Sequence, residues 1–240
     1  MEYNDNPINR LREILVPMQE TTRTTRCRSV LAANFNIPER DTASMYKALF
    51  ELITLIRKCK NVIEPIPDNS IYLEPILQAE KGVLKLSPHG EMSGFHEVVS
   101  HDTVSRLCYS ADLYKRHNRE RKVENEDLIN LQEDVEALIE KLKDSTLPIE
   151  IQDSLIEKLN SIRKAFITIR TTGIDGIQLG LESIAGVLFL NKDEIIKNNQ
   201  DENVQGVIGF LDKLNKVVQL GNGVKDLVSF FAKSLIGTST

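Results

Sequence analysis

Glycine recurs inside the most apolar helical pattern of this chain, between Arg163 and Asn191. A glycine in a helix interior costs about 1 kcal/mol relative to alanine, so several of them in one segment indicate a packing requirement. Gly176, Gly180 and Ser183 are spaced to share one helical face, and apolar residues recur at three- and four-residue steps on a neighbouring face. We therefore expect a helix whose small-residue side lets a second helix approach closely.

The composition favours a helical protein. The chain has 240 residues, and 41% of them are hydrophobic, which is enough for a well-buried core. Aromatic residues make up only 5% and Trp is absent, and this usage suits helix packing better than sheet packing. We predict an all-α fold, a multi-helix bundle built from antiparallel helical hairpins with an irregular middle segment.

Charge and cysteine content narrow the classes further. A net charge of −5 argues against a protein whose whole surface attracts nucleic acid. Cys27, Cys59 and Cys108 are widely spaced and form no Cys-x-x-Cys pair, which argues against a disulfide framework or a cysteine-rich zinc site. The polar N-terminus does not read as a secretory signal, and no run approaches the roughly 20 apolar residues of a transmembrane helix. We expect a cytoplasmic protein in a reducing compartment.

Sequence patterns divide the chain into an N-terminal helical region at 1–62, an irregular middle segment at 63–124 and a C-terminal helical bundle module at 125–240. In the first part, Pro38 and Glu39 suit the first turn of a long amphipathic helix that ends near Lys60. Prolines just beyond that residue cannot continue the helix, because proline removes an amide donor and restricts its predecessor.

The middle segment is the least regular part. A short helix is expected at Leu77–Leu86, followed by a glycine- and proline-containing loop at Ser87–Gly94. A further helix from Asp102 ends in a basic run at residues 115–122. Loops of this kind often carry functional residues.

The C-terminal module is the most clearly helical. Asn125 is expected to cap a helix that continues to Leu142, and a turn at Pro148 leads into a second helix that completes an antiparallel hairpin. After the glycine helix, the stretches Val204–Leu220 and Val224–Ile236 predict a second hairpin, with the turn at Gly221-Asn-Gly223.

One segment of this module resembles known proteins. Its pattern consists of Arg163-Lys-Ala165, Ile169-Arg170, Gly173, Asp175-Gly-Ile177, Gly180-Leu-Glu182, Ala185-Gly-Val-Leu188 and Asn191. The pattern is similar to a segment of small uncharacterised helical bacterial proteins, in which two apolar helices also follow. The resemblance covers about the last third of the chain. It implies a bacterial origin and a shared helical C-terminal module, and it implies no activity and no catalytic residues.

Catalytic and metal-binding patterns are weak. All four histidines lie in the middle segment, but His96 and His101 are five residues apart, so a helix would point them about 140° away from each other. The chain has no nucleophile elbow, no phosphate-binding glycine loop and no Arg–His spacing resembling that of helical toxin ribonucleases. Cys59 and Cys108 fall on patterns that face a core. We expect no enzyme activity, no cofactor and no metal ion.

Two basic clusters are candidates for phosphate contact. Their residues are Arg23, Arg26 and Arg28 in the first, and Lys115, Arg116 and Arg119 in the second. Lys and Arg side chains bind phosphates and release counterions. Neither cluster has interleaved aromatic residues for base stacking, so a solvated polar surface is the competing interpretation and nucleic acid is a less favoured partner.

The terminal hairpin is the other functional candidate, because its apolar residues cover more than one narrow face. Representative members are Phe210, Leu214, Leu227, Phe230 and Phe231. Such helices form a core or a homo-oligomer contact, and with lysines on the polar side they can also insert at a membrane surface.

We therefore predict a non-enzymatic protein-interaction or oligomerisation protein that acts through its C-terminal helical module on a protein partner or a second copy. The first alternative is a membrane-perturbing effector in bacterial conflict, for example phage defence. The second alternative is nucleic-acid binding through the basic clusters.

Overall fold

The computed structural model describes residues 2–118, 122–198 and 200–218. Over these ranges it contains twelve helices and two three-residue strands, so the prediction of an all-α fold is confirmed. The chain forms two compact units, which we call the N-terminal unit (Asn4–Glu120) and the C-terminal unit (Arg121–Thr240 with Met1–Tyr3). The N-terminal unit combines the expected N-terminal region with nearly all of the expected middle segment.

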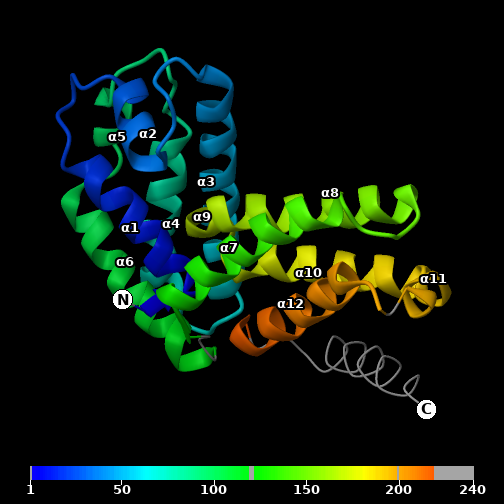
Figure 1. Cartoon of the computed structure of the whole chain (residues 1–240). Helices are drawn as coiled ribbons and strands as arrows, with labels where there is room; N and C mark the ends of the chain where they lie inside the picture. Colours follow the sequence, from blue (N-terminus) through cyan, green and yellow to red (C-terminus); the bar gives the residue numbers. More distant parts are fainter. Residues whose placement is uncertain (1, 119–121, 199, 219–240) are drawn as a thin grey trace. The chain divides into compact units, whose positions relative to one another are not determined.

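The N-terminal unit contains six helices. They are α1 (Pro7–Gln19), α2 (Cys27–Phe35), α3 (Thr42–Ile63), α4 (Ser70–Val83), α5 (Ser93–His96) and α6 (His101–His117). Helix α1 packs against α6, α3 and α2, while α4 packs against α3, α5 and α6 (Figure 1). Their buried faces share one hydrophobic core, which includes Leu11, Leu52, Cys59, Phe95 and Leu107.

Side-chain caps are present at the starts of three of these helices, α1, α3 and α6, the last with a capping box between Ser100 and Thr103. The Asn6 side chain accepts hydrogen bonds from the amides of Ile8 at 3.0 Å and Asn9 at 3.4 Å, and its own amide group donates to the Ala111 carbonyl at 3.1 Å. The start of α1 is thereby attached to α6. At α3, the Asp41 carboxylate accepts from the Ser44 amide at 3.0 Å.

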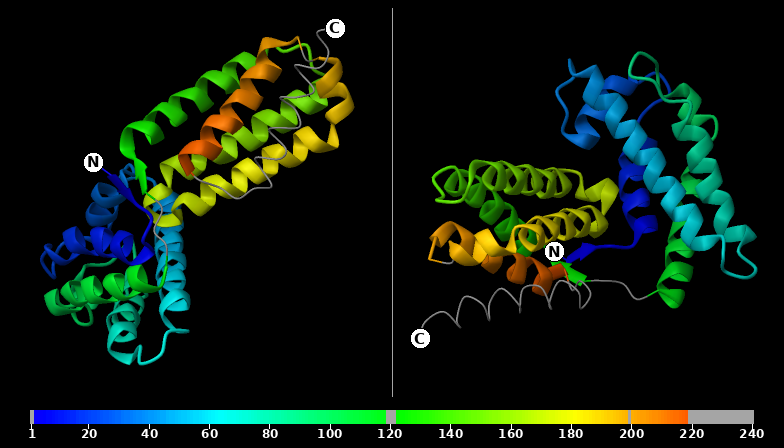
Figure 2. Two further views of the ribbon diagram at one scale, coloured as in Figure 1. Left: turned by 90° about the horizontal axis from the view of Figure 1, so that it is seen from below. Right: turned by 90° about the vertical axis from the view of Figure 1, so that its right-hand side faces the viewer.

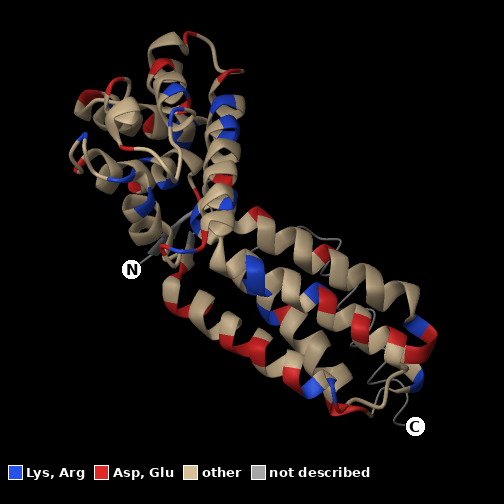
Figure 3. Ribbon diagram, turned by 90° about the horizontal axis from the view of Figure 1, so that it is seen from above, with Lys and Arg blue, Asp and Glu red and all other residues tan. Residues whose placement is uncertain are grey.

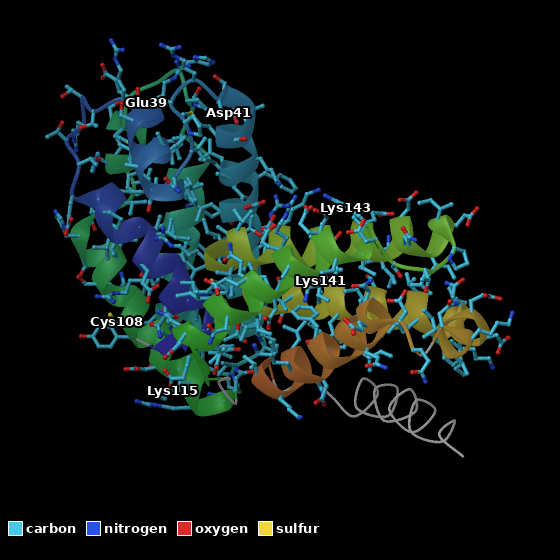
Figure 4. The ribbon with its side chains drawn as sticks, viewed as in Figure 1. Glu39, Asp41, Cys108, Lys115, Lys141 and Lys143 are labelled. Atoms are coloured by element: carbon cyan, nitrogen blue, oxygen red, sulfur yellow. The ribbon has the colours of Figure 1, made fainter. Side chains whose placement is uncertain are left out.

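The start expected for α3 at Pro38 and Glu39 is therefore wrong. Those two residues precede the helix, because Asp41 supplies the acceptor that the first amides of a helix need. Glu39 and Asp41 both lie at this end of the N-terminal unit in Figure 4.

The helix expected at Leu77–Leu86 is also misplaced, since α4 spans Ser70–Val83 and contains Pro75. Proline has no amide hydrogen, so it leaves the carbonyl four residues earlier, that of Ile71, without its helical donor. The Arg106 guanidinium supplies a replacement, donating to the Ile71 carbonyl at 3.3 Å and to Glu74 at 2.6 Å. A side chain from α6 thus compensates for the proline inside α4.

The C-terminal unit is a four-helix bundle with a short two-stranded sheet. Its elements are β1 (Glu2–Asn4), β2 (Lys122–Glu124), α7 (Asn125–Leu142), α8 (Ile149–Ile167), α9 (Ile169–Thr172), α10 (Ile174–Leu190), α11 (Lys192–Lys197) and α12 (Glu202–Val218). Helix α7 packs against α8, α8 against α10, α10 against α12 and α12 against α7, which closes a ring of four (Figures 1 and 2). Strand β1 pairs with β2.

The apolar stripes of these four helices meet inside the ring. Leu131, Leu155, Ile177, Leu181 and Leu214 are among the residues that are fully buried there. Asp and Glu residues, red in Figure 3, recur along the helices of the bundle. Asn125 is the first residue of α7 and Glu124 occupies the cap position, which differs by one residue from the expectation.

The second expected hairpin is only partly described. Helix α12 corresponds to its first half, whereas the stretch Val224–Ile236 lies outside the described residues. No helix of the described ranges has both the length and the apolar character needed to cross a bilayer.

Candidate functional site

The glycine helix α10 packs most closely at Gly180. A Cβ atom built there would overlap Cγ1 of Ile162 on α8 and would lie 3.5 Å from the Ile162 Cα atom. At Gly176, a Cβ would lie 3.1 Å from the Thr172 hydroxyl and 3.3 Å from the Ala165 Cβ. These two glycines therefore face α8, and the backbones of α8 and α10 approach each other there.

Ser183 does not share this packing role, which corrects the expectation. It lies about 60° around the helix from Gly180. Its side chain is exposed and donates to the Leu179 carbonyl at 2.7 Å. One turn further on, a Cβ at Gly186 would meet no atom within 4 Å. The outward side of α10 is thus open where its residues are small.

Large apolar side chains flank this open stretch. Leu179 is 64% exposed, Phe189 58% and Leu190 82%. We call the set Leu179, Ser183, Gly186 and Leu190, with Phe189 at its edge, the α10 face. Its spacing of four, three and four residues keeps it on one side of the helix. Single exposed apolar residues are ordinary, whereas an aligned set on one helix is a candidate contact surface.

The contact residues expected on the terminal hairpin are placed differently. Phe210 is 4% exposed and Leu214 is fully buried, and both belong to the core of the C-terminal unit. Phe210 also lines a hollow between α7 and α12, whose wall includes Gly209. Leu227, Phe230 and Phe231 lie outside the described residues, so the membrane hypothesis built on them stays a prediction.

The first basic cluster is divided by the fold. Arg26 and Arg28 line one hollow of about 380 Å³ together with Pro88, His89, Gly90 and Glu91. Arg23 contributes its charge elsewhere, since it helps to lower the pKa values of His96, where burial is the main cause, and of Glu97, where Lys85 is the main cause. Two of the three predicted arginines are therefore brought together with the loop of the middle segment.

The second basic cluster lies on another element. Lys115, labelled in Figure 4, and Arg116 are exposed in the last turn of α6, where basic side chains complement the helix dipole. Arg119 lies outside the described residues.

The histidines are dispersed over the N-terminal unit. His96 hydrogen-bonds to the Thr21 hydroxyl at 3.2 Å, and His117 Nδ1 contacts the Leu113 carbonyl oxygen at 3.0 Å. His89 lines the hollow beside Arg26 and Arg28, and His101 is the first residue of α6. In the described ranges, no three His, Cys, Asp or Glu side chains are grouped so that they could hold a metal ion.

The cysteines are placed as structural residues. Burial raises the pKa of Cys59 to about 12, and burial also raises the pKa of Cys27. Neither thiol is therefore a ready source of thiolate, the nucleophilic form. Cys108 is half-exposed on α6 (Figure 4), so the expectation that it faces the core is wrong.

Comparison with known proteins gives no match to a family model, to a curated protein or to a solved structure.

The sequence does not predict two of these features. The spacing of Gly176, Gly180 and Ser183 predicts one packing surface, whereas Ser183 and Gly186 lie on the outward side of α10. The residues of the hollow beside Arg26 and Arg28 are about 60 residues apart in the chain, so no local pattern joins them. The glycine- and proline-containing loop at Ser87–Gly94 was the available signal.

Proposed function

We propose that this chain is a non-enzymatic interaction protein whose C-terminal unit associates with a second copy of itself through the α10 face. The observation that carries the proposal is the exposure of Leu179, Phe189 and Leu190 on one helix, around a stretch where Gly186 leaves open space. Burying such side chains contributes about 25 cal/mol per Å² of apolar surface removed from water.

The α10 face is complementary to itself in the antiparallel direction. If two copies of α10 cross between Ser183 and Gly186, Leu179 of one copy meets Leu190 of the other, and Ser183 meets Gly186. Each pair then occurs twice, as the two-fold symmetry of a dimer requires. The small residues at the centre let the helices approach closely, and the leucines close both ends over a span of about 16 Å.

The size of the face sets the expected strength. Stable interfaces bury roughly 1,200–2,000 Å² in total, and a single helical stripe supplies the low end of that range. We therefore expect a reversible dimer whose population rises with protein concentration.

The test is sedimentation or light scattering over a range of concentrations. Leu190→Glu should abolish the dimer, because it places two charges against the apolar residues of the partner. Ile167→Glu is the matched control, since Ile167 is 70% exposed on α8 and lies outside the α10 face. A strict monomer, or equal loss of the dimer in both variants, would overturn the proposal.

A charge pair tests the antiparallel direction. Leu179→Glu alone and Leu190→Lys alone should each weaken the dimer, whereas the two together should restore it. In the double variant, the introduced carboxylate of each copy faces the introduced ammonium of the other. A parallel arrangement would set like charges against each other and would show no rescue.

Deleting residues 221–240 distinguishes two occupants of the α10 face, a second copy of the chain and the C-terminal residues of the same chain. The self-association should persist in the shortened chain. If the full chain is a monomer and only the shortened chain associates, then the C-terminal residues cover the α10 face and the proposal fails.

A further inference from the structure

Backbone hydrogen bonds between residues 25–27 and 90–92 form the rim of the hollow beside Arg26 and Arg28. The Met92 amide donates to the Thr25 carbonyl at 2.9 Å, and the Cys27 amide donates to the Gly90 carbonyl at 3.0 Å. Arg26 and Glu91 face each other in an antiparallel bridge between these two bonds. The two walls of the hollow are therefore held in register.

The loop wall is shaped by a tight turn. The Gly90 amide donates to the Ser87 carbonyl at 2.9 Å, and the His89 amide lies 3.3 Å from the Ser87 hydroxyl, which accepts its hydrogen. Pro88 is buried beneath this turn, while His89 is exposed on the hollow. His89 of the loop thus lines the same hollow as Arg26 and Arg28.

The two arginines have donor groups to spare. Arg28 makes one long hydrogen bond, from Nη2 to the Thr42 hydroxyl at 3.4 Å. For the Arg26 side chain, the described part of the chain supplies no hydrogen-bond acceptor and no ion-pair partner, although Glu91 stands opposite it in the backbone bridge. A guanidinium carries five N–H donors and remains charged at every pH of interest.

Helix α2 begins at the same place. Arg26 occupies its N-cap position, and no side chain caps the helix. Within the described residues the amides of Arg28 and Ser29 have no acceptor, as is usual for the first turn of an uncapped helix. The helix dipole adds a partial positive charge at this end.

We propose that this hollow binds a phosphate group carried by a small molecule, with Arg26 and Arg28 as its charged ligands. Guanidinium groups match the oxygens of a phosphate in geometry and bind them by paired hydrogen bonds. The amides at the start of α2 are placed to share in this contact, and His89 can donate from the opposite wall. Glu91 opposes the anion, since it lies on the same rim.

The size and surroundings favour a small molecule over a nucleic acid. A hollow of about 380 Å³ lies in the range of small-molecule sites. Its lining residues include no Phe, Tyr or Trp on which a base could stack. Arg23, which would extend a basic track, is not among the residues that line the hollow, and its charge acts on the pKa values of His96 and Glu97.

The test measures binding of inorganic phosphate and ribose 5-phosphate to the full chain by calorimetry or NMR titration. Arg26→Gln with Arg28→Gln should weaken the binding of both probes at least about tenfold, because both charge-assisted contacts are lost. Glu91→Gln should change the affinity in the opposite direction, strengthening it severalfold, since it removes the competing carboxylate. Lys115→Gln with Arg116→Gln removes the same amount of charge from α6 and should leave the affinity unchanged.

Opposite effects of the Arg26/Arg28 double variant and of Glu91→Gln on the affinity are the decisive result, because loss of folding cannot strengthen binding. The proposal is overturned if neither probe binds, or if the α6 double variant weakens binding as much as the double variant in the hollow. A short single-stranded oligonucleotide should bind no more tightly than ribose 5-phosphate at equal salt. Much tighter oligonucleotide binding that depends on both basic clusters would identify a nucleic-acid surface instead.

Discussion

Gly180 is the residue at which the packing of the C-terminal unit leaves least room. A Cβ there would overlap Ile162 Cγ1, an atom one bond beyond the branch point of a buried side chain, and would also approach the Ile162 backbone. We expect Gly180→Ala to leave the melting temperature unchanged or lower it, and Gly180→Leu to lower it clearly. Overpacking costs about 1–3 kcal/mol, which exceeds the gain of up to about 1 kcal/mol in helix propensity.

Gly186 supplies the matched control on the same helix. A Cβ there meets no atom of the same chain within 4 Å, so Gly186→Ala should raise the stability of the monomer by up to about 1 kcal/mol, measured at a protein concentration too low for the proposed dimer. Combining Gly180→Ala with Ile162→Ala should remove most of the cost of the glycine substitution, which a double-mutant cycle measures. Clear stabilisation by both Gly180→Ala and Gly180→Leu would show that this side of α10 is not closely packed.

Gly173 is constrained by its backbone. Its φ of 73° and ψ of −167° fall in a region that is essentially restricted to glycine, at the junction between α9 and α10. We expect Gly173→Ala to destabilise the C-terminal unit by about 1–3 kcal/mol, measured by chemical denaturation. A change within 0.5 kcal/mol, which is about what an ordinary surface substitution produces, would contradict this role.

At the scale of elements, Asp201 joins the two loops at one end of the bundle. Its Oδ2 accepts hydrogen bonds from the Ser145 hydroxyl at 2.8 Å and from the Thr146 amide and hydroxyl, each at 2.7 Å. Its Oδ1 accepts from the Asn203 amide at 2.7 Å, at the start of α12. Partial burial raises the pKa of Asp201, but the bonds from Thr146, Ser145 and Asn203 outweigh it and lower the pKa to about 2.

Because its pKa is lowered, Asp201 stabilises the folded chain by an amount that depends on pH. The carboxylate is more acidic in the folded chain than in the unfolded chain, where its pKa is about 3.9. Its contribution is therefore fully present above about pH 4 and is lost as the pH falls towards 2.

We expect Asp201→Asn to lower the free energy of unfolding at pH 7 and to have a smaller effect near pH 2, measured by denaturant titration at both values. Asp153→Asn, at an exposed position on α8, should change little at either pH. An effect of Asp201→Asn that is equal at both pH values would show that the charge of the carboxylate does not matter.

The spacing of apolar residues predicts the four long helices of the bundle and the faces that they bury. The stripe Leu128, Leu131, Val135, Leu138 and Leu142 is buried along α7 as its period required. Boundaries failed where a distant side chain intervened, as when Arg106 compensates for Pro75 and lets α4 begin at Ser70. Such a contact has no local signature.

The candidate surfaces were less predictable than the helices. Phe210 and Leu214 could equally have been core or contact residues, because periodicity identifies an apolar face without naming what covers it. Gly82 gave no signal, although a Cβ there would overlap Val99 Cγ2. The backbone bridge between Arg26 and Glu91 depends on the tertiary fold, because the spacing of residues in the sequence does not predict hydrogen bonds between two distant loops.

For the whole molecule, the main feature is that the two units have separate hydrophobic cores. The core of the N-terminal unit is built from α1 to α6 and includes Leu52, whereas that of the C-terminal unit is built mainly from α7, α8, α10 and α12 and includes Leu159. The excess of acidic over basic residues lies in the C-terminal unit, while the N-terminal unit is nearly balanced. Each unit can therefore be perturbed on its own.

Leu52→Ala and Leu159→Ala test this independence as a pair. Both side chains are fully buried, so each truncation should cost about 2–5 kcal/mol through lost burial and a residual cavity. Amide hydrogen exchange should then lose protection in α1, α3, α4 and α6 for the first variant, and in α7, α8, α10 and α12 for the second. The reason is that opening one core exposes backbone amides only in helices that contribute to it. If either variant lowers protection equally in both units, the chain unfolds as one cooperative body, and the two cores are coupled more strongly than their separate packing indicates.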